Sequence, residues 1–83
     1  MRLLYFAWVR ERIGKAEESV TPPQGVRDVA SLLDWLEGRG EGYRAALSQR
    51  AAIRVAVAQD HASLRTPVSP DDEVAIFPPV TGG

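Results

Sequence analysis

The feature that most constrains the fold is one helical repeat of apolar residues in the middle of an 83-residue chain. The repeat follows the i, i+3, i+4, i+7 spacing of a single buried helix face and consists of Val26, Val29, Ala30, Leu33 and Leu36. Gly25 precedes it and two glycines within residues 38–40 follow it, with Asp28 expected in the first turn. The pattern predicts one main helix, which must bury its apolar face against another element.

Segments rich in strand-forming residues lie on both sides of this helix. The predicted strands are residues 2–9, residues 17–21, residues 53–58, a short edge strand beginning at Leu64, and residues 74–77. Residues 9–13 are expected to form one helical turn that Gly14 stops. The second strand is expected to pair back on the first through a turn at Gly14 and Lys15, and residues 59–63 are expected to form another turn. A short second helix is predicted over residues 43–50.

This order of elements predicts an α+β protein with a β-grasp fold, in which a mixed sheet of about five strands wraps on one main helix. The length allows a single domain, residues 1–83. Residues 78–83 are expected to form a flexible carboxyl-terminal tail on that domain.

Composition excludes several classes of function. The chain has no cysteine and a single histidine, so we expect no disulfide and no thiolate- or histidine-based metal centre. Its net charge of −1 shows no basic excess, and we therefore expect no nucleic-acid partner. The apolar runs are too short to cross a bilayer, so no membrane association is expected and the cytoplasm is the default location.

Three groups of polar or small residues are weak candidates for a site. Asp60, His61 and Ser63 have the residue types of a catalytic triad, but they are near neighbours in one predicted turn, and triad members normally come from separate elements. The acidic residues 71–73 lack calcium-loop spacing and are predicted to form a solvated turn before the last strand. The glycine-rich residues 38–42 lack the lysine of a phosphate-binding loop and are predicted to end the helix.

The carboxyl-terminal segment carries a stronger signal. Phe77 ends a strand, and Pro78 and Pro79 then prevent further ladder pairing and favour an extended backbone. The last residues are Val80, Thr81, Gly82 and Gly83, and a diglycine fits a channel too narrow for any side chain. Six extended residues reach roughly 20 Å. A frayed terminus is the alternative, but the stiff stalk and bare tip together favour a tail that enters another protein's active site.

Both ends of the chain resemble one known family. Residues 72–83, DEVAIFPPVTGG, and residues 4–14, LYFAWVRERIG, are similar to the corresponding ends of molybdopterin synthase small subunits, which are ubiquitin-like sulfur carriers. Two departures are visible. Asp71 stands where the family commonly has glycine, and Ala58 stands where the family often has asparagine after a valine. The second departure lies in the turn after the third strand.

The resemblance implies a non-catalytic sulfur-donating subunit of a heteromeric sulfurtransferase. In this family the terminal glycine, here Gly83, is adenylated with ATP by an E1-like activating enzyme, and a sulfur donor protein then converts it to a thiocarboxylate. The sulfur attacks cyclic pyranopterin monophosphate inside a large subunit, which carries the catalytic groups. The expected assembly has two carriers and two large subunits. No bound cofactor is expected.

A docking surface is expected beside the tail. Phe6 and Phe77 are the candidates, since strand alternation places them opposite Tyr5 and Ile76, although the same pattern is compatible with core packing. Arg10 is a weaker candidate, for a carboxylate on a partner. Two alternatives keep the tail chemistry, a thiamine-pathway sulfur carrier and a ubiquitin-like protein modifier. A third is a β-grasp interaction module without chemistry.

Overall fold

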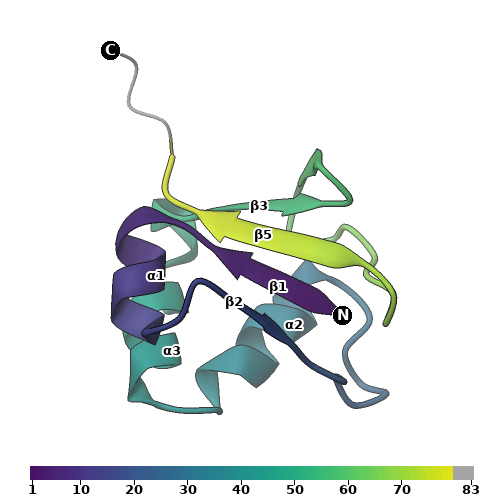
Figure 1. Ribbon diagram of the computed structural model, residues 1–83. Helices are drawn as coiled ribbons and strands as arrows, with labels where there is room; N and C mark the ends of the chain where they lie inside the picture. The colour runs from purple at the N-terminus through teal and green to yellow at the C-terminus, as the bar shows by residue number, and fades with distance from the viewer. Residues whose placement is uncertain (80–83) are drawn as a thin grey trace.

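A computed structural model describes residues 1–79 of the chain (Figure 1). Its strands are β1 (Arg2–Tyr5), β2 (Glu17–Ser19), β3 (Arg54–Val57), β4 (Asp60–Ala62) and β5 (Glu73–Phe77). Its helices are α1 (Ala7–Ile13), α2 (Val29–Glu37), α3 (Glu41–Leu47) and a 3₁₀ turn, η1 (Arg50–Ala52). The strands form one sheet in the order β2-β1-β5-β3-β4.

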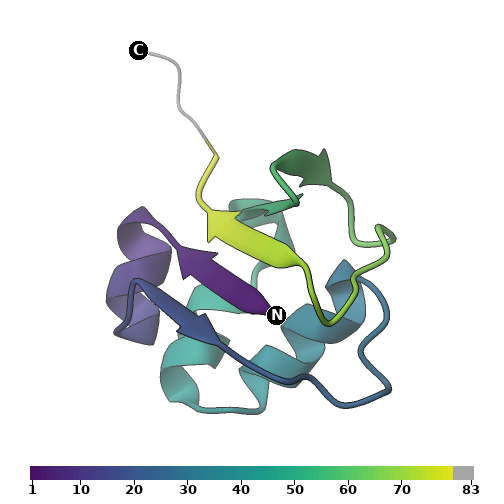
Figure 2. The ribbon, with the colours of Figure 1, turned by 45° about the vertical axis from the view of Figure 1, so that its right-hand side comes forward.

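The sheet is mixed, as the β-grasp prediction requires. The central pair β1 and β5 is parallel, while the β1–β2, β3–β5 and β3–β4 pairs are antiparallel. Figures 1 and 2 show the helices gathered on one side of the sheet, so that its other face is uncovered. The buried core lies between sheet and helices and consists of Leu3, Tyr5, Val9, Val29, Leu32, Leu33, Leu36, Tyr43, Ala46, Leu47, Ile53, Val55, Val57, Val74 and Ile76.

The main helix, α2, begins later than the sequence pattern predicts. Asp28 is its N-cap rather than a first-turn residue, because its carboxylate accepts a hydrogen bond from the Ser31 backbone N–H at 2.8 Å. The Ser31 hydroxyl in turn accepts from the Asp28 N–H at 3.1 Å, which completes a capping box. Val26 therefore precedes the helix, although it still packs against the core. Leu32 is also on the buried face of α2, although the predicted apolar stripe did not include it.

The first strand is shorter than predicted, because β1 ends at Tyr5 and the chain turns at once into α1. Ala7 makes this turn with a φ of 53°, and Gly14 ends the helix in the left-handed region with a φ of 93°. The predicted stop at Gly14 is confirmed, although α1 is longer than the single helical turn predicted over residues 9–13. Strand β2 pairs antiparallel with β1 as expected. Gly42 in α3 allows α1 to pack close, since a Cβ there would lie 2.5 Å from the Arg12 carbonyl oxygen.

The β3–β4 hairpin also differs from the prediction. Its turn is Ala58 and Gln59, with φ values of 51° and 71°, so the predicted turn over residues 59–63 was wrong and β4 occupies most of it. Two successive positive φ values match the right-handed twist of a hairpin, which explains why the turn is this tight. Leu64, predicted to begin the edge strand, instead lies in a later turn and is 45% exposed.

The short helix α3 is confirmed with its predicted inward residues, Ala46 and Leu47. It ends at Leu47, however, and η1 replaces the last predicted turn. The structure thus has α2 as its main helix, with α1 and α3 packed beside it.

Candidate functional site: the sheet end that carries the tail

The tail leaves from the middle of the sheet. Strand β5 lies between β1 and β3 and is held by both, with its buried residues Val74 and Ile76 on the core face. The Phe6 N–H donates to the Ile76 carbonyl at 3.1 Å, one residue before β5 ends. Pro78 and Pro79 follow and are half-buried. The stalk therefore starts from a position that its neighbouring strands fix in place.

The four last residues predicted to form the tail lie outside the described part of the chain. These are Val80, Thr81, Gly82 and Gly83. Their roles in insertion and as the reacting group therefore stay predictions.

The two predicted docking aromatics both lie at this end of the sheet and outside the buried core. Phe6 is 46% exposed and forms the N-cap position of α1 rather than part of β1. Phe77 is half-buried on the uncovered face, where its ring meets the His61 ring edge-on, with centroids 6.1 Å apart. Arg10 is exposed on α1, and its backbone N–H is bonded to the Phe6 carbonyl oxygen. Phe6 and Phe77 thus lie at the root of the tail, where β5 continues into Pro78, and Arg10 lies one helical turn beyond Phe6.

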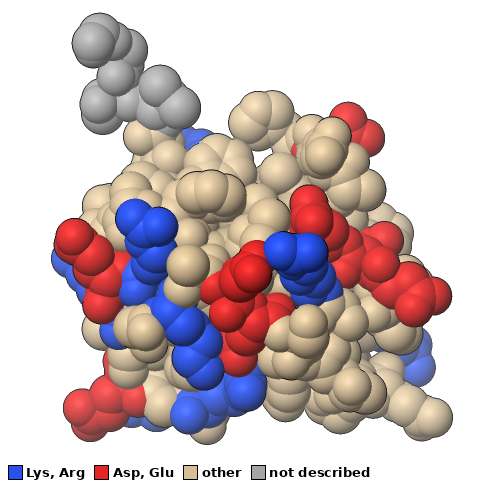
Figure 3. All heavy atoms as spheres, viewed as in Figure 1, with Lys and Arg blue, Asp and Glu red and all other residues tan. Residues whose placement is uncertain are grey.

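The uncovered sheet face extends this group. Strand register aligns one transverse row across all five strands, and from β4 to β2 it reads His61, Ala56, Ala75, Leu4 and Glu17. The three central residues of the row are half-buried and apolar, so the middle of the face is flat and uncharged. Figure 3 views this side and shows mainly uncharged atoms near the tail end, with one blue group beside the base of the tail and further charged side chains lower down and at the borders.

Leu4, Ala56, Ala75 and His61 were not among the predicted docking residues. Period-two alternation places each of them opposite a core residue and was the available signal. It shows which side chains share a face, but not which face the helices leave open.

The weaker sequence candidates form no catalytic arrangement. Asp60 and His61 are successive residues of β4 and therefore point to opposite faces of the sheet. The Ser63 backbone and hydroxyl contact Thr66 instead of either of them. The Asp72 carboxylate accepts from the Ser69 N–H at 2.7 Å, which confirms its predicted place in the turn before the last strand.

Residues 1–79 contain no group of three or more histidine, cysteine, aspartate or glutamate side chains that could hold a metal ion. Within the same residues, none of the helices has the length and apolar character needed to span a bilayer.

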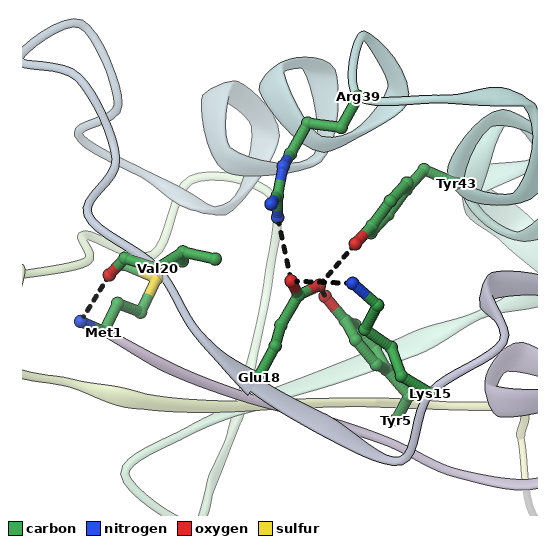
Figure 4. Close-up of polar contacts among 7 residues, drawn as sticks. All are labelled: Met1, Tyr5, Lys15, Glu18, Val20, Arg39 and Tyr43. Carbon is green, nitrogen blue, oxygen red and sulfur yellow. Dashed lines mark hydrogen bonds and ion pairs between the residues drawn. The ribbon is translucent and has the colours of Figure 1, made fainter.

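A carboxylate cluster lies on the opposite, helix-covered face and was not predicted (Figure 4). The Glu18 side chain of β2 is only 11% exposed. Its Oε2 accepts hydrogen bonds from the hydroxyls of Tyr5, at 2.7 Å, and Tyr43, at 2.6 Å. Its Oε1 pairs with Arg39 at 3.1 Å and Lys15 at 3.4 Å. Every polar atom that converges here has a partner, which is how a protein keeps a carboxylate near its core.

The cluster shifts the ionisation of its members. Burial is the largest single influence on the pKa of Glu18 and raises it, but the contacts of the carboxylate together outweigh burial and hold that pKa below its ordinary value. The hydrogen bonds from Tyr43 and Tyr5 are the largest of these contacts. The charges of Arg39 and Lys15 act in the same direction. Burial is the main cause that raises the pKa of Tyr5 far above its usual range, and the hydrogen bond to Glu18 is the next largest cause. The Tyr5 hydroxyl therefore keeps its proton and stays a hydrogen-bond donor. The cluster therefore fastens β2 to β1 and α3.

One apolar cavity of about 300 Å³ opens between α2, β3 and the segment after β4. Its floor is formed by the core residues Val29, Leu33, Ile53 and Val55, with Leu64 at its lining. Its lining does not include Phe6, Phe77 or Arg10, but it does include Arg50 and Arg54.

Comparison with known proteins agrees with this architecture. The chain is 34% identical, over 83 residues that cover all of it and 99% of the relative, to the molybdopterin synthase sulfur carrier subunit of Escherichia coli. The crystal structure of small archaeal modifier protein 1 from Haloferax volcanii superposes with a TM-score of 0.75 at 30% identity, covering 100% of this chain and 98% of that one.

A Helicobacter pylori complex of subunits 1 and 2 of the molybdopterin-converting factor contains a chain of the same fold. That chain has a TM-score of 0.65 at 19% identity, and the match covers 99% of this chain and 96% of that one. A family model described as the ThiS family matches residues 3–83. The β-grasp fold, the tail root at the sheet centre and these matches together show that the chain belongs to the ThiS family.

Proposed function

We propose that this protein is the sulfur carrier subunit of a molybdopterin synthase. One observation carries the proposal: the stalk, Pro78 and Pro79, is anchored on the central strand β5 beside an uncovered apolar face. The chain that carries this stalk aligns over its full length with a relative named as a molybdopterin synthase sulfur carrier subunit. Residues 1–79 offer no metal-binding group, and the candidate triad residues do not come together. A division of labour in which the partner supplies the catalytic groups fits this composition.

The proposed chemistry takes place on Gly83. At neutral pH a terminal carboxylate is ionised and is a poor electrophile. An E1-like activating enzyme joins the carboxylate to AMP and releases pyrophosphate from ATP. A sulfur donor protein then supplies a sulfur nucleophile that displaces AMP, and the carrier is left with a thiocarboxylate. The net change on the carrier is the exchange of one oxygen for one sulfur.

The proposed recipient is cyclic pyranopterin monophosphate, bound by the large subunit. The thiocarboxylate sulfur displaces an oxygen substituent from a side-chain carbon of the pterin, and water then hydrolyses the resulting thioester. Hydrolysis leaves the sulfur on the pterin and returns Gly83 as a carboxylate, and successive carriers supply the two sulfurs of the molybdopterin dithiolene. We propose an assembly of two carriers and two large subunits in the cytoplasm, where ATP is available. Phe6 and Phe77 are the proposed apolar contacts, because exposed aromatic rings beside a functional segment favour a partner surface.

The test is the intact mass of the protein after incubation with its activating enzyme, ATP and a sulfide source. We expect a mass increase equal to one oxygen-to-sulfur exchange, and no change in a variant that lacks Gly83. That variant should melt at the same temperature as the wild type, because the buried core lies within residues 1–79. An unaltered wild-type mass would contradict the proposal and favour an interaction module.

A matched variant separates activation from delivery. Gly82→Leu keeps the Gly83 carboxyl group but adds a side chain to the tip. We expect it to lose sulfur transfer to the pterin in the presence of the large subunit, because a narrow channel excludes the leucine. Normal turnover of this variant would argue against insertion of the tail. Failure of the wild type to form a dithiolene, with its thiocarboxylate intact, would point to another recipient such as the thiamine pathway.

A second candidate is a protein modifier joined to lysines, and the 30% identity to a small archaeal modifier protein favours it. It uses the same activated carboxyl group but ends in an amide rather than a thiocarboxylate. The appearance of larger, amide-linked conjugates that depend on Gly83 and ATP, in an extract of the source cells, would support this function.

A further inference from the structure

We propose that Arg54 is a carboxylate-binding position at the border of the uncovered sheet face, with His61 of the neighbouring strand β4 beside it. The large subunit would present an acidic side chain to this position. This inference rests on the proposed function, since it names a contact of the same carrier with the same partner. It concerns specificity rather than chemistry, because neither residue is placed to touch the reacting atoms.

Arg54 lies beside the root of the tail. It is the register partner of Phe77 across the β3–β5 ladder, so the two Cβ atoms lie on the uncovered face, roughly 5 Å apart. The Arg54 side chain also lines the apolar cavity beside β3. The residue is exposed. Its Nη1 donates to the backbone carbonyls of Ile53, at 2.9 Å, and Ala51, at 3.2 Å. These two bonds hold the guanidinium at the end of β3 nearest the tail.

The charge of Arg54 is not neutralised within residues 1–79, where it forms no ion pair. Arg2, at the far end of the same face, is by contrast paired with Glu17. A guanidinium has five N–H donors, and two backbone contacts through one nitrogen leave most of the fork available. Such a fork matches a carboxylate in geometry as well as charge.

His61 completes this border of the face. Its ring is exposed and meets Phe77 edge-on at an interplanar angle of 63°, so it continues the aromatic surface toward β4. It also adds a ring N–H that can donate a hydrogen bond. The face is therefore apolar in the middle and rich in donors on its β3–β4 side. An asymmetric charge pattern of this kind fixes the orientation of a partner and rejects partners with a basic rim.

The position of the tail determines which partner this is. If Gly83 reacts, it does so as only the fourth residue after Pro79, and four extended residues span roughly 14 Å. A protein that receives Gly83 in its active site must therefore lie against this end of the sheet, where Phe6, Phe77 and Arg54 are found. The large subunit fits this requirement.

The test compares variants that carry the same change of charge. Affinity for the large subunit from the same organism is measured by titration calorimetry for the wild type, Arg54→Glu and Arg27→Glu. Arg27 is the control, because it is also exposed, forms no ion pair within residues 1–79, and lies in the segment before α2 rather than on this face. We expect Arg54→Glu to weaken binding at least tenfold and to reduce its salt dependence, and Arg27→Glu to change it less than twofold.

Two further variants keep the result interpretable. Arg54→Gln removes the charge without adding a repulsive one and should weaken binding about threefold to tenfold. If Arg54→Glu melts at a lower temperature than the wild type, the affinity of Arg54→Gln becomes the test of the proposal. His61→Phe keeps the aromatic contact but removes the ring donor, and should weaken binding about twofold to fivefold.

The inference would be overturned if both Arg54 variants bind like the wild type, or if Arg27→Glu weakens binding as much as Arg54→Glu. Failure of the proposed function looks different, because the wild type itself would then neither bind the large subunit nor deliver sulfur to the pterin.

Discussion

The two faces of the sheet differ in how much apolar surface they expose and in whether their charged side chains are paired. The helix-covered face buries its apolar residues, and its largely buried carboxylate, Glu18, is surrounded by hydroxyl and cationic partners. The uncovered face leaves Phe6 and Phe77 partly exposed and holds Arg54 in place without an acidic partner among the described residues. The contacts of the first face are satisfied within the domain, while a partner could bury the aromatic rings and pair the arginine of the second. Substitutions on the first should therefore change stability, and substitutions on the second should change binding.

The largest expected effect tests the covered face. Leu33 is fully buried on α2. We expect Leu33→Ala to lower the free energy of unfolding by about 2 to 5 kcal/mol, because it removes buried contacts and leaves a cavity. Chemical denaturation followed by circular dichroism measures the change. Leu64→Ala is the matched control, since Leu64 is 45% exposed and should cost far less. Equal losses in the two variants would mean that α2 does not cover this face as described.

The next effect concerns the carboxylate cluster. Glu18→Gln keeps the shape of the side chain but removes its charge, and we expect a loss of about 1.5 to 3 kcal/mol near pH 7, the range for hydrogen bonds to charged groups. Because the folded-state pKa of Glu18 lies below its ordinary value, its stabilising contribution is full above the unfolded pKa and is lost as the pH falls through the folded pKa.

The stabilities of the wild type and Glu18→Gln should therefore converge as the pH falls from about 5 through the lowered pKa of Glu18. Urea titrations at a series of pH values measure this gap. Asp28, whose pKa is also lowered through its bonds to Ser31, is present in both proteins and cancels in the difference. A gap that stays constant into acid would show that the charge of Glu18 does not contribute.

A smaller effect, in binding alone, is expected on the uncovered face. Phe6→Ser should weaken binding to the large subunit about tenfold, or roughly 1.4 kcal/mol, because an exposed aromatic ring loses its contact with the partner. Its melting temperature should stay close to that of the wild type, since the ring is outside the buried core. A large drop in melting temperature with unchanged affinity would show that Phe6 stabilises the fold and does not contact the partner.

The smallest effect lies at the β3–β4 turn. Ala58 has a φ of 51°, which costs alanine roughly 1 to 2 kcal/mol and asparagine less. We expect Ala58→Asn to stabilise the protein by about 0.5 to 1 kcal/mol, measured as a higher denaturant midpoint. Ala51→Asn, at an exposed residue without a positive φ, should give no such gain. A lower midpoint for Ala58→Asn would show that the turn is not under backbone strain.

Two errors in the sequence-based fold share one physical cause. The early end of β1 depends on Ala7, and the tight turn after β3 depends on Ala58 and Gln59, all with positive φ values that these residues rarely adopt. Local propensity cannot predict such conformations, because packing of α1 and pairing of β4 with β3 impose them. The late start of α2 is different, since Asp28 and Ser31 are a recognisable capping pair within the sequence.

The sequence by itself determined the apolar stripe of α2, the alternation in β3 and β5, and the stalk of Pro78 and Pro79 at the end of an apolar strand, because these depend on local periodicity and on proline chemistry. Only the tertiary structure decided which face of the sheet stays open, and that Glu18 is enclosed while Arg54 is not. Those outcomes depend on where the helices pack, and contacts between residues far apart in the chain cannot be read from local spacing.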